Sequence, residues 1–308
     1  MKNCPICSSA AELFHARVAD YEYGTNTSVD YNRCSACQLL FQTPRPAVEV
    51  LKSYYPHDYR HHVQHVGKVP LFLKFLSWLK NIQTDMLVAK CAKFISSPDS
   101  KILEFGCGAG QFIKALSRAG YKNLTGIDQN PELKKVFQDS PIQFITGTVG
   151  ESLTLQPPYD TIIMHSVIEH IVEPLEFLTY CKKILSPNGS VIIRTPNANS
   201  ICHSLYGRYW AGLQAPRHIW LFNENNLKNA ALQAGFAGID WIRIEDPSGW
   251  AFSMQNLISS LLKTRPANGS NAWYTILSMP LWMPCSWIES WARRPSTLFC
   301  AIKNKADG

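Results

Sequence analysis

Four of the ten cysteines in this 308-residue chain form two CxxC pairs, CPIC at Cys4 and Cys7 and CSAC at Cys34 and Cys37. Each short loop can present two thiolates to one face of a tetrahedral Zn²⁺ ion. In a reducing compartment, such paired motifs are better explained by a metal than by disulfides, with redox pairs or coincidence as the alternatives. Because four thiolates fill the coordination sphere of the ion, the spacing predicts a structural zinc, away from any chemical centre.

A second chemical motif is KILEFGCGAG, in which Gly106, Gly108 and Gly110 follow an apolar strand candidate and precede a helix candidate. Glycine is used where the backbone turns sharply or lies against a ligand, and an ordinary strand-to-helix turn is the alternative. The dinucleotide fingerprint needs its third glycine one position later, where this chain has Gln111. Glu104 would repel a pyrophosphate, so the loop favours a cationic or zwitterionic ligand.

Asp128 ends the strand-like segment LTGID, 22 residues after Gly106. An acidic side chain in this place can accept hydrogen bonds from both hydroxyls of a ribose, as in nucleotide-binding α/β folds. The alternative is a carboxylate that caps the turn before Asn130 and Pro131. The glycine loop and Asp128 together are more informative than either motif alone.

The elements that position these residues follow from the hydrophobic pattern. Residues 1–46 are expected to form the zinc-binding module, which closes with the strand-like QLLFQ and the breaker TPRP. Residues 47–97 have apolar side chains at helical spacing, which predicts a linker and covering helices. Over residues 98–308, short apolar strands alternate with helices, as in a doubly wound parallel α/β sheet. Within this part we expect a Pro-Asn-Gly turn at 187–189 and a Trp-rich insertion at about 248–295.

Composition and charge narrow the function classes. The chain has 46% hydrophobic and 17% charged residues, so it can bury a core, and its net charge of +7 is spread without a run of like charges. Nucleic-acid binding is therefore not indicated. The start, MKNCPICSSA, lacks the apolar region of a secretory signal, so we expect a cytoplasmic protein.

Four segments of the chain occur in the order of one known family: EFGCGAG, GID, YDTIIMHSVIEHIVEP and LSPNGSVIIRTPN. They resemble the class I S-adenosylmethionine-dependent methyltransferases, which have a Rossmann-like doubly wound sheet. The cysteine segment is similar to the N-terminal zinc-binding portion of bacterial members that act on sugars and other small metabolites. The resemblance implies S-adenosylmethionine as cofactor, bound by Glu104, Gly106, Gly108, Gly110, Asp128, Gln129, Gly147, Thr148 and His165.

The resemblance also implies a role for each of these residues. The three glycines would lie against the methionine part of the cofactor, with Glu104 near its amino end and Asp128 on the ribose. Gln129 would lie over the adenine, with Gly147 and Thr148 beside the adenine edge. The histidine that ends YDTIIMH would lie against the cofactor near the end of its strand.

Glu169 and His170 form a pair that resembles the ubiquinone-pathway O-methyltransferases, where a carboxylate three residues earlier joins both side chains around a magnesium ion. Ser166 takes that earlier place here. Because Mg²⁺ depends on carboxylate oxygens, the loss of one of two anionic ligands weakens such a site, and no Mg²⁺ is predicted.

Methyl transfer to a hydroxyl or to an acidic C–H group calls for a base, and a neutral histidine can serve near pH 7. Among nine histidines, His170 and His218 are equal candidates. His218 lies in APRHIWLF, a segment that borders the acceptor pocket in similar methyltransferases, and His203 is the third candidate. For each of the three, a hydrogen-bonded structural role is the alternative.

Two further segments are candidates for contact with the acceptor. The linker carries Tyr54, Tyr55 and Tyr59, which can form a lid over a pocket. The Trp-rich segment 266–292 has too many interruptions by proline and polar residues for a spanning helix. We expect an apolar lid over the acceptor pocket in preference to an interfacial hairpin, which would place the protein at the inner membrane surface.

The sequence therefore predicts an enzyme that methylates a small molecule, such as a sugar or a glycolipid, on oxygen in preference to carbon. One alternative is a zinc-ribbon methyltransferase for nucleic acid or protein. The cysteine module does not offer a phosphate-binding face for such a partner, because it carries Glu12, Asp20, Glu22 and Asp30. The other alternative is a scaffold that binds the cofactor without catalysis, which the intact glycines and Asp128 disfavour.

Overall fold

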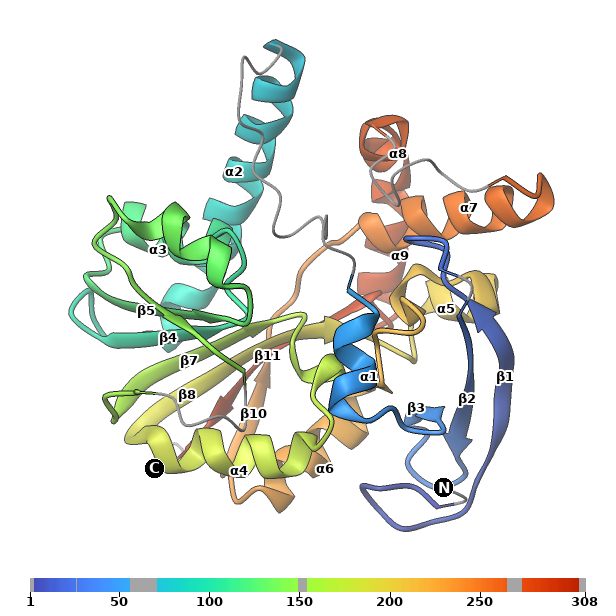
Figure 1. Ribbon diagram of the computed structural model, residues 1–308, viewed down its shortest axis with the longest axis horizontal. Coiled ribbons are helices and arrows are strands. Elements are labelled where there is room, and N and C mark those ends of the chain that lie inside the picture. Colours follow the sequence, from blue (N-terminus) through green and yellow to red (C-terminus); the bar gives the residue numbers. More distant parts are fainter. Residues whose placement is uncertain (1–2, 26, 56–70, 149–153, 265–272, 305–308) are drawn as a thin grey trace.

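The computed structural model of the protein describes residues 3–25, 27–55, 71–148, 154–264 and 273–304. Its main body is a sheet covered by helices, and a smaller sheet built largely from N-terminal residues lies beside it (Figure 1). The predicted α/β, Rossmann-like fold is confirmed. The predicted domain boundaries stay a prediction.

The larger sheet has seven strands in the order β10-β11-β8-β7-β4-β5-β6. The five strands from β8 to β6 run parallel, whereas β11 lies antiparallel between β8 and β10. The alternation of strands and helices predicted this sheet, although its last strand joins it antiparallel. The strands are β4 (Lys101–Phe105), β5 (Asn123–Asp128), β6 (Gln143–Thr146), β7 (Tyr159–His165), β8 (Leu185–Pro196), β10 (Gly238–Trp241) and β11 (Thr297–Lys303).

Helices cover both faces of this sheet, and each face has its own buried cluster. On one face, α2 (Leu71–Cys91) and α3 (Gln111–Arg118) contribute Val88, Phe112 and Ile113. On the other face, α4 (Pro174–Ile184) and α6 (Glu224–Gln233) contribute side chains such as Phe177 and Leu227. The other helices are α1 (Val48–Ser53), α5 (Ile201–Tyr206), α7 (Ser248–Leu261), α8 (Trp273–Ser278) and α9 (Met283–Trp291). The 3₁₀ segments are η2 (Ala92–Phe94), η3 (Pro131–Phe137), η4 (Ile168–His170), η5 (Gly207–Tyr209), η6 (Ala211–Leu213) and η7 (Met279–Trp282).

The predicted turn at 187–189 is wrong, because these residues lie inside β8. The pairing with β7 explains why. Leu185 pairs with Tyr159 and Ser190 with Thr161, so β8 advances five positions where β7 advances two. The extra residues are taken up as an irregularity in the strand, and no separate turn is needed.

The smaller sheet has the order β1-β2-β3-β9 and is antiparallel. Three strands come from the cysteine module, namely β1 (Ala11–Ala19), β2 (Ser28–Cys34) and β3 (Leu40–Thr43). The fourth, β9 (Trp220–Leu221), comes from the later part of the chain and pairs with Leu40 and Phe41. This pairing brings the segment that precedes β9 against the cysteine module.

Candidate active site

The loop between β4 and α3 carries three glycines with positive φ angles, 63° at Gly106, 51° at Gly108 and 80° at Gly110. A Cβ atom on Gly106 would lie 2.7 Å from Cγ2 of Val167, and one on Gly110 would lie 2.7 Å from Cζ of Phe137. Backbone conformation and lack of space therefore both require glycine here. The loop follows the carboxyl end of β4, which is the edge where open α/β sheets bind ligands.

Asp128 lies beside this loop at the end of β5. One of its carboxylate oxygens accepts a hydrogen bond from the backbone N of Gly108 (2.9 Å), and the other accepts one from the backbone N two residues on (3.0 Å). The backbone N of Gly147 donates to the carbonyl of Asp128 (3.0 Å), which places the end of β6 next to it. The other two positions expected at the adenine are Gln129, which is exposed, and Thr148, which is half-buried.

Glu104, which is buried, and His165, which is half-buried, form a pair near the ends of β4 and β7. Oε1 of Glu104 lies 3.8 Å from Nδ1 of His165. Among the described residues, neither Oε2 of Glu104 nor Nε2 of His165 has a hydrogen-bond partner. Burial raises the pKa of Glu104 well above its usual range and lowers the pKa of His165 to about 3, so the imidazole is neutral. A buried carboxyl oxygen without a partner is costly, and a cationic ligand would remove that cost.

Three further polar side chains meet at the same edge of the sheet. Glu169 and His170 belong to η4, which follows β7, and His218 belongs to the segment before β9. Nε2 of His218 lies 3.9 Å from Oε1 of Glu169, and the rings of His170 and His218 lie edge to face with centroids 4.6 Å apart. Thr195, at the end of β8, donates a hydrogen bond to Oε2 of Glu169 (2.9 Å). We call Glu169, His170 and His218 the histidine cluster.

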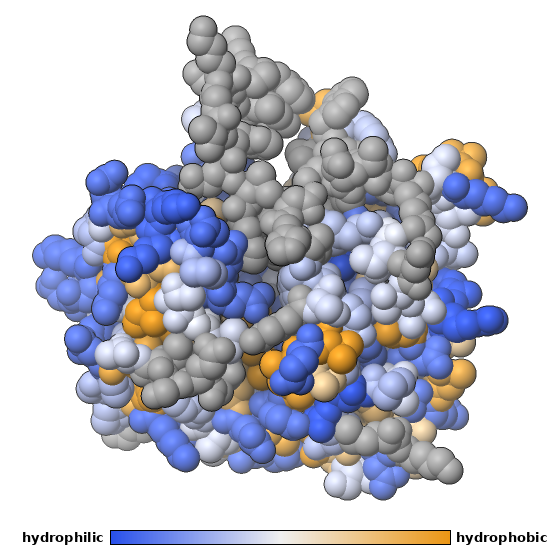
Figure 2. Space-filling view, in the orientation of Figure 1, coloured by the Kyte–Doolittle hydropathy of each residue, from blue (hydrophilic) through white to orange (hydrophobic). Residues whose placement is uncertain are grey.

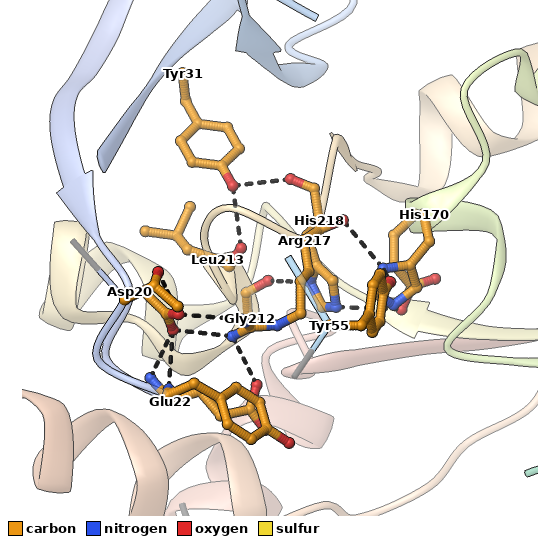
Figure 3. A network of polar contacts seen from close by, with 12 residues as sticks. Asp20, Glu22, Tyr31, Tyr55, His170, Gly212, Leu213, Arg217 and His218 are labelled. Atoms are coloured by element: carbon orange, nitrogen blue, oxygen red, sulfur yellow. Dashed lines mark hydrogen bonds and ion pairs between the residues drawn. The ribbon is translucent and has the colours of Figure 1, made fainter. Parts of the chain in front are cut away.

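Backbone carbonyls set the tautomers of both rings in this cluster (Figure 3). Nδ1 of His218 lies 2.8 Å from the carbonyl oxygen of Gly212, and Nδ1 of His170 lies 3.0 Å from that of Arg217. A carbonyl only accepts hydrogen bonds, so each Nδ1 carries a proton and each Nε2 keeps its lone pair. The Tyr55 hydroxyl lies 2.9 Å from Nδ1 of His170. The structure thus brings together the two histidines predicted as base candidates, with one tyrosine of the linker.

Burial sets the charge of each group in the cluster. It raises the pKa of Glu169 to about 7 and lowers the pKa of His170 to about 4. Burial, helped by the neighbouring His170, holds the pKa of His218 well below its usual range. Both imidazoles are therefore neutral near pH 7, and Glu169 ionises in the physiological range.

Arg217, the residue before His218, fixes this segment to the cysteine module. Its guanidinium group is fully buried and donates to both carboxylate oxygens of Asp20 (3.2 and 3.0 Å) and to Glu22 (3.0 Å). A bidentate pair of this kind holds its partners in one geometry. From the sequence, Asp20 and Glu22 were predicted only as charges that disfavour nucleic acid, and no motif indicated this contact with Arg217.

Tyr31 of β2 makes the second link between the module and the cluster. Its hydroxyl group lies 2.8 Å from the carbonyl oxygen of His218 and 3.1 Å from that of Leu213, and donates to them (Figure 3). The whole side chain is buried. No feature of the sequence around Tyr31 indicated this role, because its partners are backbone atoms far along the chain.

His203, the third base candidate, makes its contacts with residues outside the histidine cluster. Its Nδ1 donates to the carbonyl of Ala198 (2.6 Å), its Nε2 lies 3.0 Å from Nε2 of His15, and its ring packs on Trp210. These contacts are those of a structural histidine. Of the linker tyrosines, Tyr59 lies outside the described residues.

The ligand atoms of the histidine cluster do not fit a magnesium ion of the kind held by the ubiquinone-pathway O-methyltransferases that the Glu169–His170 pair resembles. Its three candidate ligand atoms lie within 4.8 Å of one another, but two are imidazole nitrogens and one is a carboxylate oxygen. Mg²⁺ prefers oxygen ligands in a nearly ideal octahedron. Ser166, which stands where a second carboxylate would be needed, is exposed.

The cysteines of the two CxxC pairs lie together, with their sulfur atoms within 4.8 Å of one another. Sγ of Cys4 lies 3.6 Å from that of Cys37, and Sγ of Cys7 lies 3.4 Å from that of Cys34. Zn–S bonds of about 2.3 Å place the sulfur atoms of a tetrahedral site roughly 3.8 Å apart, so the four thiols fit a Zn²⁺ ion. Two asparagine side chains at the start of α6 donate to the carbonyl of Cys37 (3.1 and 3.2 Å), which joins this site to the main body.

Comparison with known proteins agrees with this geometry. Residues 75–240, a little over half of the chain, match the methyltransferase domain family. A ubiquinone biosynthesis O-methyltransferase of Cereibacter sphaeroides is 24% identical over 190 residues, which cover 56% of this chain and 76% of the relative. One of Xylella fastidiosa is 33% identical over 113 residues, which cover 34% of this chain and 46% of the relative.

The fold also matches a solved structure. The complex between the Haloferax volcanii Trm112 methyltransferase activator and a methyltransferase has a chain that superposes with a TM-score of 0.50 at 14% identity, covering 75% of this chain and 93% of that one. The unpartnered oxygen of Glu104, the loop that requires glycine and the carboxylate of Asp128 fit the amino end, methionine part and ribose of S-adenosylmethionine. The chain therefore belongs to the methyltransferase domain family, as an S-adenosylmethionine-dependent enzyme.

Proposed function

We propose that this enzyme methylates a hydroxyl oxygen of a small-molecule acceptor, with His218 as the general base. The observation that carries the proposal is that Nε2 of a neutral His218 has no hydrogen-bond partner within the described part of the chain and lies 3.9 Å from the carboxylate of Glu169, at the carboxyl edge of the sheet. Oxygen as the acceptor atom is supported by the O-methyltransferases among the relatives.

The cofactor supplies a methyl group on a sulfonium centre, and the chain's part is to hold it. Glu104 would accept hydrogen bonds from the amino group, and Asp128 would accept them from the ribose hydroxyls. The other residues that we assign to cofactor binding are Gly106, Gly108, Gly110, Gln129, Gly147, Thr148 and His165.

The histidine cluster would take the proton that the acceptor loses. As the acceptor oxygen attacks the methyl carbon, its proton passes to Nε2 of His218, and the Glu169 carboxylate stabilises the imidazolium that forms. The Nδ1–H bond to Gly212 keeps the ring in place during this transfer. His170, with its neighbour Tyr55, would line the acceptor's other side. Holding the acceptor oxygen in line, about 3 Å from the methyl carbon and away from water, supplies much of the acceleration.

A sugar or a glycolipid is the acceptor class that we propose. The cysteine module supports this choice, because it resembles that of bacterial methyltransferases acting on sugars and related metabolites. The competing proposal for the acceptor is nucleic acid or protein.

The test uses the full-length protein with methyl-labelled S-adenosylmethionine and separate acceptor pools: free and nucleotide-linked sugars, glycolipids, phenols, oligonucleotides and cell protein. We expect label in an O-methyl group of a sugar-containing pool, and normal turnover in His203→Gln, a matched variant that loses a buried imidazole outside the cluster. Label confined to oligonucleotide or protein would overturn the acceptor class. Tight cofactor binding with no transfer to any pool would identify a scaffold.

A further inference from the structure

Helices between β10 and β11 bury several polar side chains and expose a row of apolar ones. In α9, Ser286 and Glu289 are only 3% and 1% exposed. The opposite stripe, at positions i, i+3, i+4 and i+7, is exposed and consists of Pro284, Trp287 (58%), Ile288 (57%) and Trp291 (87%). Helices on the surface of a soluble protein have the reverse arrangement.

The neighbouring helices also bury polar side chains. Thr275 in α8 is buried, and α7 buries Ser253 and Gln255 together with the apolar Trp250 and Ala251. Exposed apolar residues follow on the outside of α8, of η7 and of the end of α7, which pack against one another. We call the outward set the apolar face, made of Ile258, Leu261, Leu262, Tyr274, Leu277, Leu281, Trp287, Ile288 and Trp291. Figure 2 shows hydrophobic side chains at the end of α7, at the upper right of the molecule.

Hydrogen bonds on the inner side hold this orientation. Glu289 accepts from the backbone N of Cys202 (2.8 Å) and from the backbone N and hydroxyl of Ser296 (3.0 and 2.6 Å). The hydroxyl of Thr275 donates to Oε1 of Gln255. Rotating the helices to bury the apolar face would break these bonds and leave buried polar groups without partners. The outward apolar face is therefore built into the fold.

Most of the charged side chains near the apolar face are basic, and the acid Glu245, which contacts Ser290 of α9, is half-buried and pairs with Lys90. Within the described residues of 247–264 and 273–294, the charged side chains that reach the surface are Lys263, Arg293 and Arg294, and the one acid, Glu289, is buried. Tryptophan, tyrosine and basic residues around an apolar surface are typical of helices that lie in a membrane interface, where the rings enter the headgroup region and cations meet anionic lipids.

We propose that the apolar face binds the surface of a bilayer that contains anionic lipids. Single exposed apolar residues are ordinary on a protein surface, whereas many exposed apolar residues on helices that pack together mark an interaction site. None of the helices that the structure describes is long and apolar enough to cross a membrane, so the contact would be peripheral. The proposal does not depend on the acceptor or on the role of His218. The exposure of these side chains favours this contact over a lid on the acceptor pocket, which stays a prediction.

The test is co-sedimentation of the full-length protein with vesicles of phosphatidylcholine alone or mixed equally with phosphatidylglycerol. We expect binding to the mixed vesicles and weaker binding to the neutral ones. The triple variant Trp287→Ser, Ile288→Ser, Trp291→Ser should lower the partition coefficient by roughly tenfold or more, because it loses three apolar side chains that would enter the bilayer. Its circular dichroism should be unchanged, since all three side chains are exposed.

A matched control removes exposed apolar side chains elsewhere, with Leu13→Ser on β1 and Leu232→Ser on α6. This variant should bind vesicles as the parent does. Equal binding by the parent and the triple variant would overturn the proposal. It would also be overturned if the parent ignored both kinds of vesicle but formed a dimer that the triple variant could not form, because the apolar face would then contact a second copy of the chain.

Discussion

The cofactor edge and the histidine cluster share one edge of the large sheet but are assembled differently. Glu104, the glycine loop and Asp128 belong to a single unit of β4, α3 and β5, whose local backbone sets their spacing. His218 reaches the cluster on a separate segment, which Arg217 and Tyr31 tie to the small sheet. Damage to the small sheet should therefore disturb the histidine cluster and spare the cofactor edge.

Removing the zinc should give the largest difference between the effects on the histidine cluster and on the cofactor edge. We expect one Zn²⁺ per chain in the freshly purified protein, and its loss in Cys34→Ser should unfold the cysteine module because structural zinc binding contributes folding free energy. Turnover should be lost, while the cofactor dissociation constant changes by less than about threefold, roughly 0.65 kcal/mol. Elemental analysis, calorimetry and a methyl-transfer assay measure these quantities.

The variant Cys181→Ser is a suitable control, since Cys181 is a buried cysteine of α4 outside the two CxxC pairs. It should keep its zinc. An absence of zinc from the parent protein would remove the metal assignment, and full turnover in zinc-free protein would show that the histidine cluster does not need the module.

His218→Gln should produce the next largest effect. Loss of a general base lowers the rate by about 10²–10⁴-fold, so kcat should fall in that range. The cofactor dissociation constant should stay within twofold of the parent's, about 0.4 kcal/mol, because His218 lies outside the unit of β4, α3 and β5. A near-normal kcat in this variant would leave His170 as the base candidate and would show that His218 has only a structural role.

These two regions also differ in how far the sequence predicts them. The glycine loop and Asp128 were predicted because the requirement for positive φ and the acidic strand end are local properties of the sequence. The predicted alternation of strands and helices gave the sheet, apart from the turn at 187–189. The hydrogen bonds from Tyr31 and Asp20 to the segment of His218 join residues nearly two hundred positions apart. Contacts at such a separation produce neither a hydrophobic period nor a motif with fixed spacing in the sequence.

Asp128→Ala tests the cofactor edge directly. Charge-assisted hydrogen bonds contribute about 1.5–3 kcal/mol each, so the loss of those to the ribose should weaken cofactor binding by at least roughly tenfold. Calorimetry on the folded variant measures this change. Asp99→Ala, which removes an exposed aspartate paired with Lys122, should leave the affinity unchanged. Unchanged affinity in Asp128→Ala would contradict the ribose assignment.

The raised pKa of Glu169 predicts a pH dependence of the chemistry. Because burial raises this pKa to about 7, the carboxylate forms as the pH increases through 7, and only the carboxylate can stabilise an imidazolium on His218. We expect kcat to rise about tenfold between roughly pH 6 and pH 8, since one group that titrates at 7 changes its ionised fraction by that factor. Glu169→Gln should lower kcat and abolish the rise.

Through Glu169, a rise in pH should have the opposite effect on the stability of the fold to its effect on kcat. A carboxyl group whose pKa is higher in the folded state than its ordinary value of 4.5 binds its proton more tightly when folded. Its contribution to stability is therefore complete below about 4.5 and is lost as the pH rises through about 7. Glu169→Gln should weaken this pH dependence of the unfolding free energy, and an unaltered dependence would show that another group causes it.

Tyr31→Phe should have the smallest effect, and it tests the link between the small sheet and the histidine cluster. The variant keeps the buried ring and removes only the hydroxyl that donates to the carbonyls of His218 and Leu213. A neutral hydrogen bond contributes about 0.5–1.5 kcal/mol, so we expect kcat to fall about threefold to tenfold with little change in cofactor affinity.

Tyr159→Phe is the matched control, because Tyr159 is also a buried tyrosine, at the start of β7 on the edge of the sheet away from the cluster. Nitrogen NMR of the imidazole rings adds a readout that does not depend on the acceptor: the signals of His218 should shift in Tyr31→Phe and stay fixed in Tyr159→Phe. If both variants moved those signals equally, general loosening of the fold would explain the effect, and the small sheet would have no specific part in positioning His218.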